Sequence, residues 1–301
     1  MFALLPVDKP RGVNSRRIVD AMEKASGEKV GHAGTLDPLA SGVLVLAIGL
    51  ATRLVPYVHV MPKQYVARFQ LGVESDSDDM ERECRDVPMD TSPTFEAMHT
   101  AIAQFVGPIE QTPPDFSAIR VNGKRAYRLA HRGKEFTIPP RTVTIYSSRL
   151  IRYEFPYFEI ECCCSSGTYM RSLGRDIAAL LGTRCVMVEL SRSAVGPFDL
   201  GRCASLLDVK KDKFHEKLVD PLEAFSGLPI VALGEYDIER ISRGVKYECA
   251  LENAAAEMLV TDLHGHLHAV LRPASDGKWR PALNFSKYWR ERPARLERSA
   301  P

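Results

Sequence analysis

The 301-residue sequence contains no run of about 18 apolar residues, so it predicts no membrane-spanning helix. Its start, MFALLPVDKP, lacks the basic residues and the small-residue cleavage site of a signal peptide. Seven cysteines are present but no CxxC pair, and the consecutive run Cys162–Cys164 would place neighbours on opposite faces of a strand. We therefore interpret the cysteines as small buried hydrophobic residues and predict a cytoplasmic protein without a disulfide framework or a metal site.

Charges of one sign gather in separate regions, although the formal net charge is only +2. Residues 74–90 carry eight carboxylates against two arginines, whereas residues 120–152 and 278–298 are basic. Aromatic side chains are interleaved with both basic regions, for example Tyr127 and Trp289. The pattern fits a polyanionic partner, and a plain solvated surface explains it equally well.

Hydrophobic periodicity predicts an α+β fold. Strands are expected at residues 2–7, 43–49, 64–72, 143–151, 157–164 and 185–192, and helices at residues 15–25, 94–106, 170–181 and 236–244. The acidic residues 74–90 are interpreted as a loop, and residues 205–226 as one or two short helices.

Proline pairs bracket residues 113–140, which we interpret as an insertion. It contains a hairpin turn at Asn122–Gly123 and a short basic helix after it. The sequence pattern changes after residue 228, where short predicted strands dominate. We place a domain boundary there, between residues 1–228 and a small β-rich module at residues 229–301.

The loop GHAGTLDPLASG contains a single carboxylate, Asp37, among small residues. Gly31, Gly34 and Gly42 permit unusual backbone conformations, and Pro38 restricts Asp37 to extended geometry. The loop is therefore expected to be flexible at its edges and stiff at the acid. An aspartate in such a loop often only caps a turn. Neither GxxxxGK[ST] nor GxGxxG occurs, which excludes an ATP or a dinucleotide loop.

Family resemblance gives this loop a more specific meaning. GHAGTLDPLASGVLVLAIG closely resembles the catalytic motif of the TruB family of tRNA pseudouridine synthases. Other segments resemble that family in the same order: VDKPRGVNS (7–15), KQYVARFQLGVESDSDD (63–79), PPDFSAIRVNGKRAY (113–127), SSGTYMRSLGRDIAALLG (165–182) and VELSRSAVGPF (188–198). Asn14 departs from the more usual Thr, and Arg120 stands where Lys is common.

The resemblance covers residues 2–226 and implies a pseudouridine synthase domain. Its sheet would be central, mixed and largely antiparallel, flanked by helices and interrupted by the basic insertion. The C-terminal module resembles a reduced PUA domain, a small β module that binds RNA.

Each site residue is carried over from a matching motif. Asp37 would be the catalytic carboxylate, acting on the ribose as nucleophile or as base. Arg171 would pair with it and favour its ionised form, and Tyr65 would stack on the target base. Leu190 would form an apolar wall, and His32 would fill the space that the flipped nucleotide leaves. Without the resemblance, these side chains are an ordinary surface charge, core residues and a structural histidine.

The insertion would grip the T stem-loop of tRNA through phosphate contacts. Its candidate RNA-binding residues are Arg120, Lys124, Arg125, Arg128 and Arg132. The implied target is uridine 55. No metal or cofactor is required, because uracil itself is the group that rearranges. We expect a monomer without an obligatory protein or guide-RNA partner.

Two alternatives remain open. A guide-RNA-dependent synthase of the dyskerin type shares the core motifs, but those proteins lack the basic insertion. A non-catalytic tRNA-binding chaperone is disfavoured by the intact set of acid, tyrosine and arginine.

Overall fold

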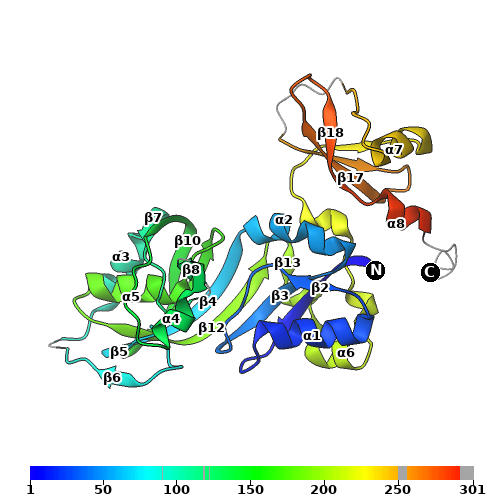
Figure 1. Ribbon diagram of the computed structural model, residues 1–301. Helices are drawn as coiled ribbons and strands as arrows, with labels where there is room; N and C mark the ends of the chain where they lie inside the picture. The colour runs from blue at the N-terminus through cyan, green and yellow to red at the C-terminus, as the bar shows by residue number, and fades with distance from the viewer. Residues whose placement is uncertain (90, 118, 122, 250–255, 292–301) are drawn as a thin grey trace.

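One long mixed sheet and one smaller sheet organise the chain (Figure 1). The computed structural model describes residues 1–89, 91–117, 119–121, 123–249 and 256–291. The long sheet has the order β14 (Ala204–Ser205), β1 (Phe2–Lys9), β3 (Ala40–Gly49), β12 (Cys185–Val195), β4 (Lys63–Leu71), β11 (Tyr157–Cys164), β10 (Arg141–Glu154) and β7 (Gly107–Gln111). Two further strands join it, β2 (Val30–His32) beside β3 and β13 (Phe198–Asp199) beside β12.

Pairing in the long sheet is antiparallel except for β1 with β14 and β3 with β12, which are parallel. The predicted α+β class with a mixed, largely antiparallel sheet is therefore confirmed. The helices of this part are α1 (Ser15–Ser26), α2 (Val55–Val60), α3 (Phe95–Ala103), α4 (Ala126–Ala130), α5 (Met170–Leu180) and α6 (Leu206–Lys210), with short 3-10 turns at Leu50–Leu54, Leu200–Arg202, His215–Lys217 and Pro221–Ala224.

Local sequence explains the first helix and the central strand. Asn14 caps α1 by accepting a hydrogen bond from the Arg17 backbone N–H, and Gly27 ends the helix in the left-handed region at φ 68°. In β4, odd-numbered residues are buried and even-numbered residues are more exposed, as its alternating pattern predicts. Tyr65 therefore shares the buried face of β4 with Phe69.

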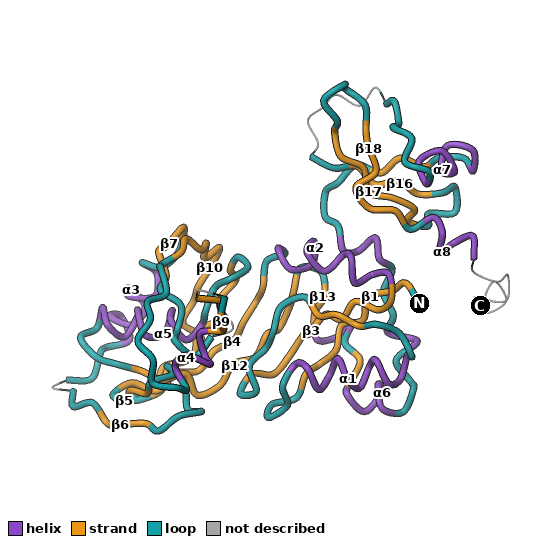
Figure 2. Tube along the Cα trace, viewed as in Figure 1, coloured by secondary structure: helices purple, strands orange, loops and turns teal. Residues whose placement is uncertain are grey.

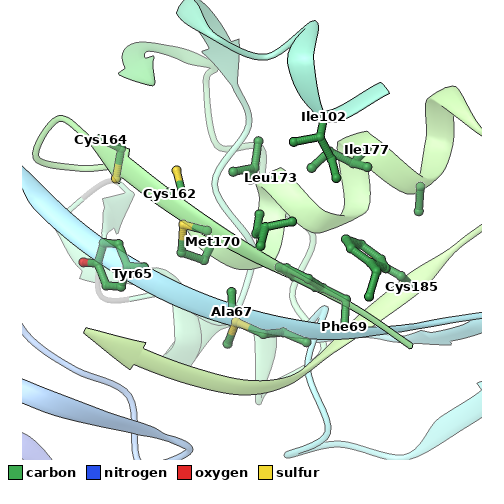
Figure 3. Packing of buried hydrophobic residues seen from close by; sticks show 14 of the residues in the cluster. Tyr65, Ala67, Phe69, Ile102, Cys162, Cys164, Met170, Leu173, Ile177 and Cys185 are labelled. Atoms are coloured by element: carbon green, nitrogen blue, oxygen red, sulfur yellow. The ribbon is translucent and has the colours of Figure 1, made fainter. Parts of the chain in front are cut away.

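Helix α5 covers this face of β4 and β11 (Figure 3). Gly174 allows the close approach, because a Cβ there would lie 2.2 Å from the Phe69 ring. Phe69 in turn stacks on Phe158 of β11 at 4.9 Å between ring centroids. Tyr65 lies at one end of this cluster, so the core that packs against α5 extends as far as Tyr65.

The second sheet has the order β15 (Ile230–Ala232), β16 (Met258–Thr261), β17 (Leu267–Pro273) and β18 (Trp279–Asn284). With α7 (Glu235–Ser242) and α8 (Ser286–Glu291) it forms a small unit beside the N-terminal strand, far from α3 and α5 (Figure 2). Phe2 of β1 stacks on Phe285 at 4.7 Å, which contributes to joining this unit to the long sheet. The boundary near residue 228 stays a prediction.

Three details of the sequence interpretation need correction. Residues 74–90 are not simply a loop, because β5 (Val73–Ser75) and β6 (Cys84–Asp86) form a two-stranded ribbon within them. The helix expected at residues 94–106 ends earlier, and β7 follows it. Among the cysteines, Cys162, Cys164 and Cys185 are buried, but Cys84 is exposed because it lies on this ribbon outside the core.

The insertion folds largely as expected. Strands β8 (Arg120–Val121) and β9 (Lys124–Arg125) pair as a short hairpin, followed by α4. Of the predicted turn, Asn122 lies outside the described residues, as do Asp90 of the acidic region and the basic residues beyond 291. In the described part of the chain, every helix is too short or too polar to cross a bilayer.

Candidate active site

The loop that carries Asp37 is held in place by residues from the turn after β1 and from the start of α1. The buried Ser15 hydroxyl donates to the Leu36 carbonyl at 2.8 Å and accepts from the Leu36 N–H at 2.9 Å. Gly12 N–H donates to the Pro38 carbonyl at 2.7 Å. The backbone is thus fixed on both sides of Asp37, which explains how a loop of small residues can aim one acid.

A buried arginine of β12 holds the edges of the same loop. Arg192 donates from Nη2 to the Gly34 carbonyl at 2.9 Å and from Nε to the Val43 carbonyl at 2.7 Å. Gly42 has φ +101°, and a Cβ there would lie 2.2 Å from the Arg192 carbonyl oxygen. The edges predicted to be flexible are therefore hydrogen-bonded. Sequence reasoning missed Arg192 and Ser15, because no local pattern distinguishes them from ordinary polar residues.

Arg171 of α5 joins the loop to a second carboxylate. Its Nη2 donates to Asp37 Oδ2 at 3.0 Å, and its Nη1 lies 3.1 Å from Asp79 Oδ2. It also donates to the carbonyls of Ser77 and Phe116, each at 3.0 Å. The Arg171 and Asp79 side chains are 5% and 2% exposed, whereas that of Asp37 is 40% exposed. A buried carboxylate and two carbonyls thus orient the guanidinium, which presents one edge to an accessible acid.

Asp79 was not predicted as a site residue. It lies in the acidic region between β5 and β6, where eight carboxylates share similar local contexts. Ser77 Oγ donates to its Oδ1 at 2.5 Å, and the backbone N–H of Glu81 donates to the same oxygen at 3.0 Å. Only the tertiary contact with Arg171 sets it apart from its neighbours.

Asp37, Tyr65, Arg171 and Leu190 line one cavity of about 330 Å³, so the structure brings four of the five predicted site residues together. This volume falls within the range of small-molecule sites. Tyr65 is buried, and this burial raises the pKa of its hydroxyl, so the ring presents a neutral face. The cavity therefore combines one acid with aromatic and apolar walls.

The fifth residue, His32, does not line this cavity. It lies on β2, opposite Leu46 of β3, and its buried Nδ1 has no hydrogen-bond partner among the residues that the structure describes. Burial, assisted by the Arg192 charge, lowers the pKa of the imidazole. The neutral ring is therefore favoured at this position.

Basic side chains form another part of the cavity wall. Lys63 lies there beside His59 and Arg192. Its ammonium donates to the Met61 carbonyl at 2.7 Å and to the His59 carbonyl, and burial followed by the Arg192 charge lowers its pKa to about 8. Lys63, Arg192 and Arg171 outnumber Asp37, the one carboxylate among the described residues of this lining, so the cavity favours an anionic ligand.

The predicted RNA-binding residues of the insertion gather nearby. Arg120, Lys124, Arg125, Arg128 and Arg132 line a hollow of about 530 Å³, together with Tyr127. Such a cluster of guanidinium groups around an aromatic ring suits a phosphate backbone.

The insertion also contacts Arg171 through Phe116. Arg82 lies over the Phe116 ring at 4.2 Å and contacts His131 Nδ1 at 2.7 Å. The Phe116 carbonyl is one of the two carbonyls that accept a hydrogen bond from Arg171. Arg82 is one of the two arginines of the acidic region, and these contacts connect that region to the insertion.

The chain is similar to known proteins over most of its length. A model described as "TruB family pseudouridylate synthase (N terminal domain)" matches residues 21–170. A tRNA pseudouridine synthase B from Dehalococcoides mccartyi is 35% identical over 290 residues, which make up 95% of this chain and 97% of the relative. The chain belongs to the TruB family. A second TruB relative, from Rhodopirellula baltica, is 40% identical over 261 residues, covering 81% of this chain and 75% of the relative.

Solved structures are similar to this chain in fold. A chain in the crystal structure of a Cbf5–Nop10–Gar1 complex is 26% identical with a TM-score of 0.67, covering 90% of this chain and 78% of that chain. A chain in an H/ACA RNP bound to a substrate RNA containing 2′-deoxyuridine has a TM-score of 0.68 and 24% identity, covering 94% and 84%. The second likeness shows a shared fold.

Proposed function

We propose that this TruB protein isomerises uridine to pseudouridine in tRNA, at position 55 of the T loop. The observation that carries the proposal is the ion pair of 3.0 Å between Asp37 and Arg171 in a cavity that Tyr65 also lines. Support also comes from the curated relatives named tRNA pseudouridine synthase B.

The reaction breaks the N1–C1′ bond, turns the uracil and forms a C5–C1′ bond, while the hydrogen on C5 leaves as a proton and N1 takes up a proton. Asp37 acts on the ribose, either as a nucleophile at C1′ or as a base that removes a ribose proton. Arg171 keeps the carboxylate ionised and aimed. Tyr65 stacks on the base, and Leu190 closes the apolar wall, so the detached uracil stays beside the sugar.

The target uridine must leave its stacked position to reach this cavity. His32 lies on β2, which pairs with β3, and would occupy the space that the nucleotide vacates. Its neutral, uncharged ring suits a place between stacked bases.

The basic insertion at residues 113–140 would hold the T stem-loop through its phosphates. The module at residues 229–301, which we treat as a separate PUA-like domain, would extend the RNA contact. The protein would work as a monomer, without a guide RNA or a protein partner, and without a cofactor.

A product assay on bare tRNA tests the proposal. The purified protein should release tritium from a tRNA transcript labelled at C5 of uridine, with no other protein or RNA present. A transcript with cytidine at position 55 should release none. Release that persists in the second transcript would contradict the position, and a requirement for a guide RNA would favour the dyskerin-type alternative.

Neutralising the insertion should weaken RNA binding strongly. Changing Arg125, Arg128 and Arg132 to glutamine removes three charges from one hollow. Affinity for tRNA at physiological salt should fall by about 100-fold, and the slope of log K against log salt should flatten by about 2 to 3. Filter binding at several salt concentrations measures both quantities.

A matched control changes three exposed arginines that are paired with carboxylates. Arg16, Arg149 and Arg152 form ion pairs with Asp20, Glu161 and Glu154, respectively. Their replacement with glutamine removes the same charge but should leave the salt slope nearly unchanged. Equal effects of the two triple variants would mean that net charge, and not the insertion, governs binding.

A further inference from the structure

Arg141 lies between the cavity of Asp37 and a second hollow, and it has no role in the proposed reaction. It begins β10 and lines both the cavity of Asp37 and a neighbouring hollow of about 560 Å³. The second hollow is formed by the insertion, including residues 135–140. An RNA strand that passes from the insertion into the cavity would therefore run past this side chain.

The guanidinium of Arg141 is held in one orientation before any ligand arrives. Its Nη2 donates to the Gly167 carbonyl, and its Cζ lies 4.9 Å from the centre of the Tyr169 ring. Gly167 has φ +91°, and a Cβ there would lie 3.4 Å from the guanidinium. A side chain at that position would be strained and would crowd the arginine, so the glycine helps to form its seat.

The charge of Arg141 has no counter-charge in the described part of the chain. No carboxylate there forms an ion pair with it, although Glu135 lines the same hollow, and its Nε is buried without a hydrogen-bond partner. Arg149 and Arg152 of the same strand differ, since each lies within 2.8 Å of a carboxylate oxygen. Arg149 pairs with Glu161 of β11 and Arg152 with Glu154 of β10, so this sheet supplies carboxylates to other arginines of β10, but not at the cavity mouth.

We infer that Arg141 binds one of the two backbone phosphates that flank the flipped uridine. This inference rests on the proposed function. A nucleotide whose ribose reaches Asp37 must leave its two phosphates at the mouth of the cavity, because the RNA chain enters and exits there. A seated guanidinium with an uncompensated charge matches the oxygens of a phosphodiester. The contact carries no sequence information, so Arg141 positions C1′ relative to Asp37.

Uncharged phosphates provide the test. Three stem-loop RNAs of one sequence are compared: an unmodified RNA and two RNAs with a single methylphosphonate, placed 5′ or 3′ of the target uridine. For the wild-type chain, one of the two replacements should weaken binding about tenfold, the size expected for one charge-assisted contact. For Arg141→Gln, the unmodified RNA should bind about tenfold more weakly, and the same replacement should then change binding less than twofold.

Arg149→Gln is the matched control, because Arg149 lies on the same strand but is exposed and paired with Glu161. This variant should keep the tenfold effect of the methylphosphonate. If both methylphosphonates weaken Arg141→Gln as much as they weaken the wild type, Arg141 does not bind a flanking phosphate.

Arg141→Met keeps the test decisive if the glutamine variant does not fold, which circular dichroism and thermal melting will show. Methionine is an unbranched side chain without charge, so the methylphosphonate should change its binding less than twofold, as for glutamine. An unchanged tenfold effect in a folded methionine variant would overturn the inference. Tritium release by the wild type on the unmodified RNA tests the proposed function separately, since binding is measured without turnover.

Discussion

Replacing Asp37 with asparagine is expected to lower pseudouridine formation by more than about 10⁴-fold, while tRNA binding stays within about twofold of the wild type. The amide has the size of the carboxylate, and its oxygen can still accept the hydrogen bond from Arg171 Nη2. It can act neither as a nucleophile on C1′ nor as a base toward a ribose proton. The loss should therefore appear in the chemical step and not in affinity.

Single-turnover tritium release and filter binding separate the two quantities for Asp37→Asn. Asp76→Asn is a suitable control, because Asp76 is an exposed carboxylate paired with Arg85 and outside the cavity lining. It should keep wild-type rates. Turnover by Asp37→Asn above the stated limit, in a sample shown by mass spectrometry to contain no aspartate at that position, would overturn the role of Asp37.

Replacing Arg171 with methionine is expected to cost both activity and stability. The substitution removes the partner of Asp37 and leaves the Asp79 carboxylate, 2% exposed, without its counter-charge. Breaking a buried pair in this way costs about 3 to 5 kcal/mol of unfolding free energy. The rate should fall about 10³-fold, because the acid loses the fixed Nη2 donor that orients it.

A double variant separates these two losses. Combining Arg171→Met with Asp79→Asn removes the uncompensated buried charge, so urea denaturation should recover about 2 kcal/mol or more relative to Arg171→Met alone. The rate of tritium release should not recover, because Asp37 still lacks its partner. Recovery of both the unfolding free energy and the rate would mean that Arg171 acts only through folding. Recovery of neither would mean that the unpaired Asp79 charge does not cause the loss of stability.

Much of the fold follows from local patterns. The alternation in β4 places Tyr65 on the buried face, and Asn14 and Gly27 mark the ends of α1. The short strands β5 and β6 were missed, because they are only three residues long, half of their residues are charged, and their pairing is stabilised by tertiary contacts such as that of Asp79 with Arg171. Family motifs also named Asp37 and Arg171 as partners, although 134 positions separate them.

The sequence by itself determined the fold class, the loop with its acid, and four of the residues that line the cavity. Only the tertiary structure decided how that acid is held, through Ser15 and Arg192, and which carboxylate supports Arg171. It also placed His32 outside the cavity lining. The physical reason is that local patterns act over only a few neighbouring residues. Periodicity and caps indicate which face of an element is buried and where it ends. Hydrogen-bond partners from distant segments depend on the strand order, which puts β12 between β3 and β4.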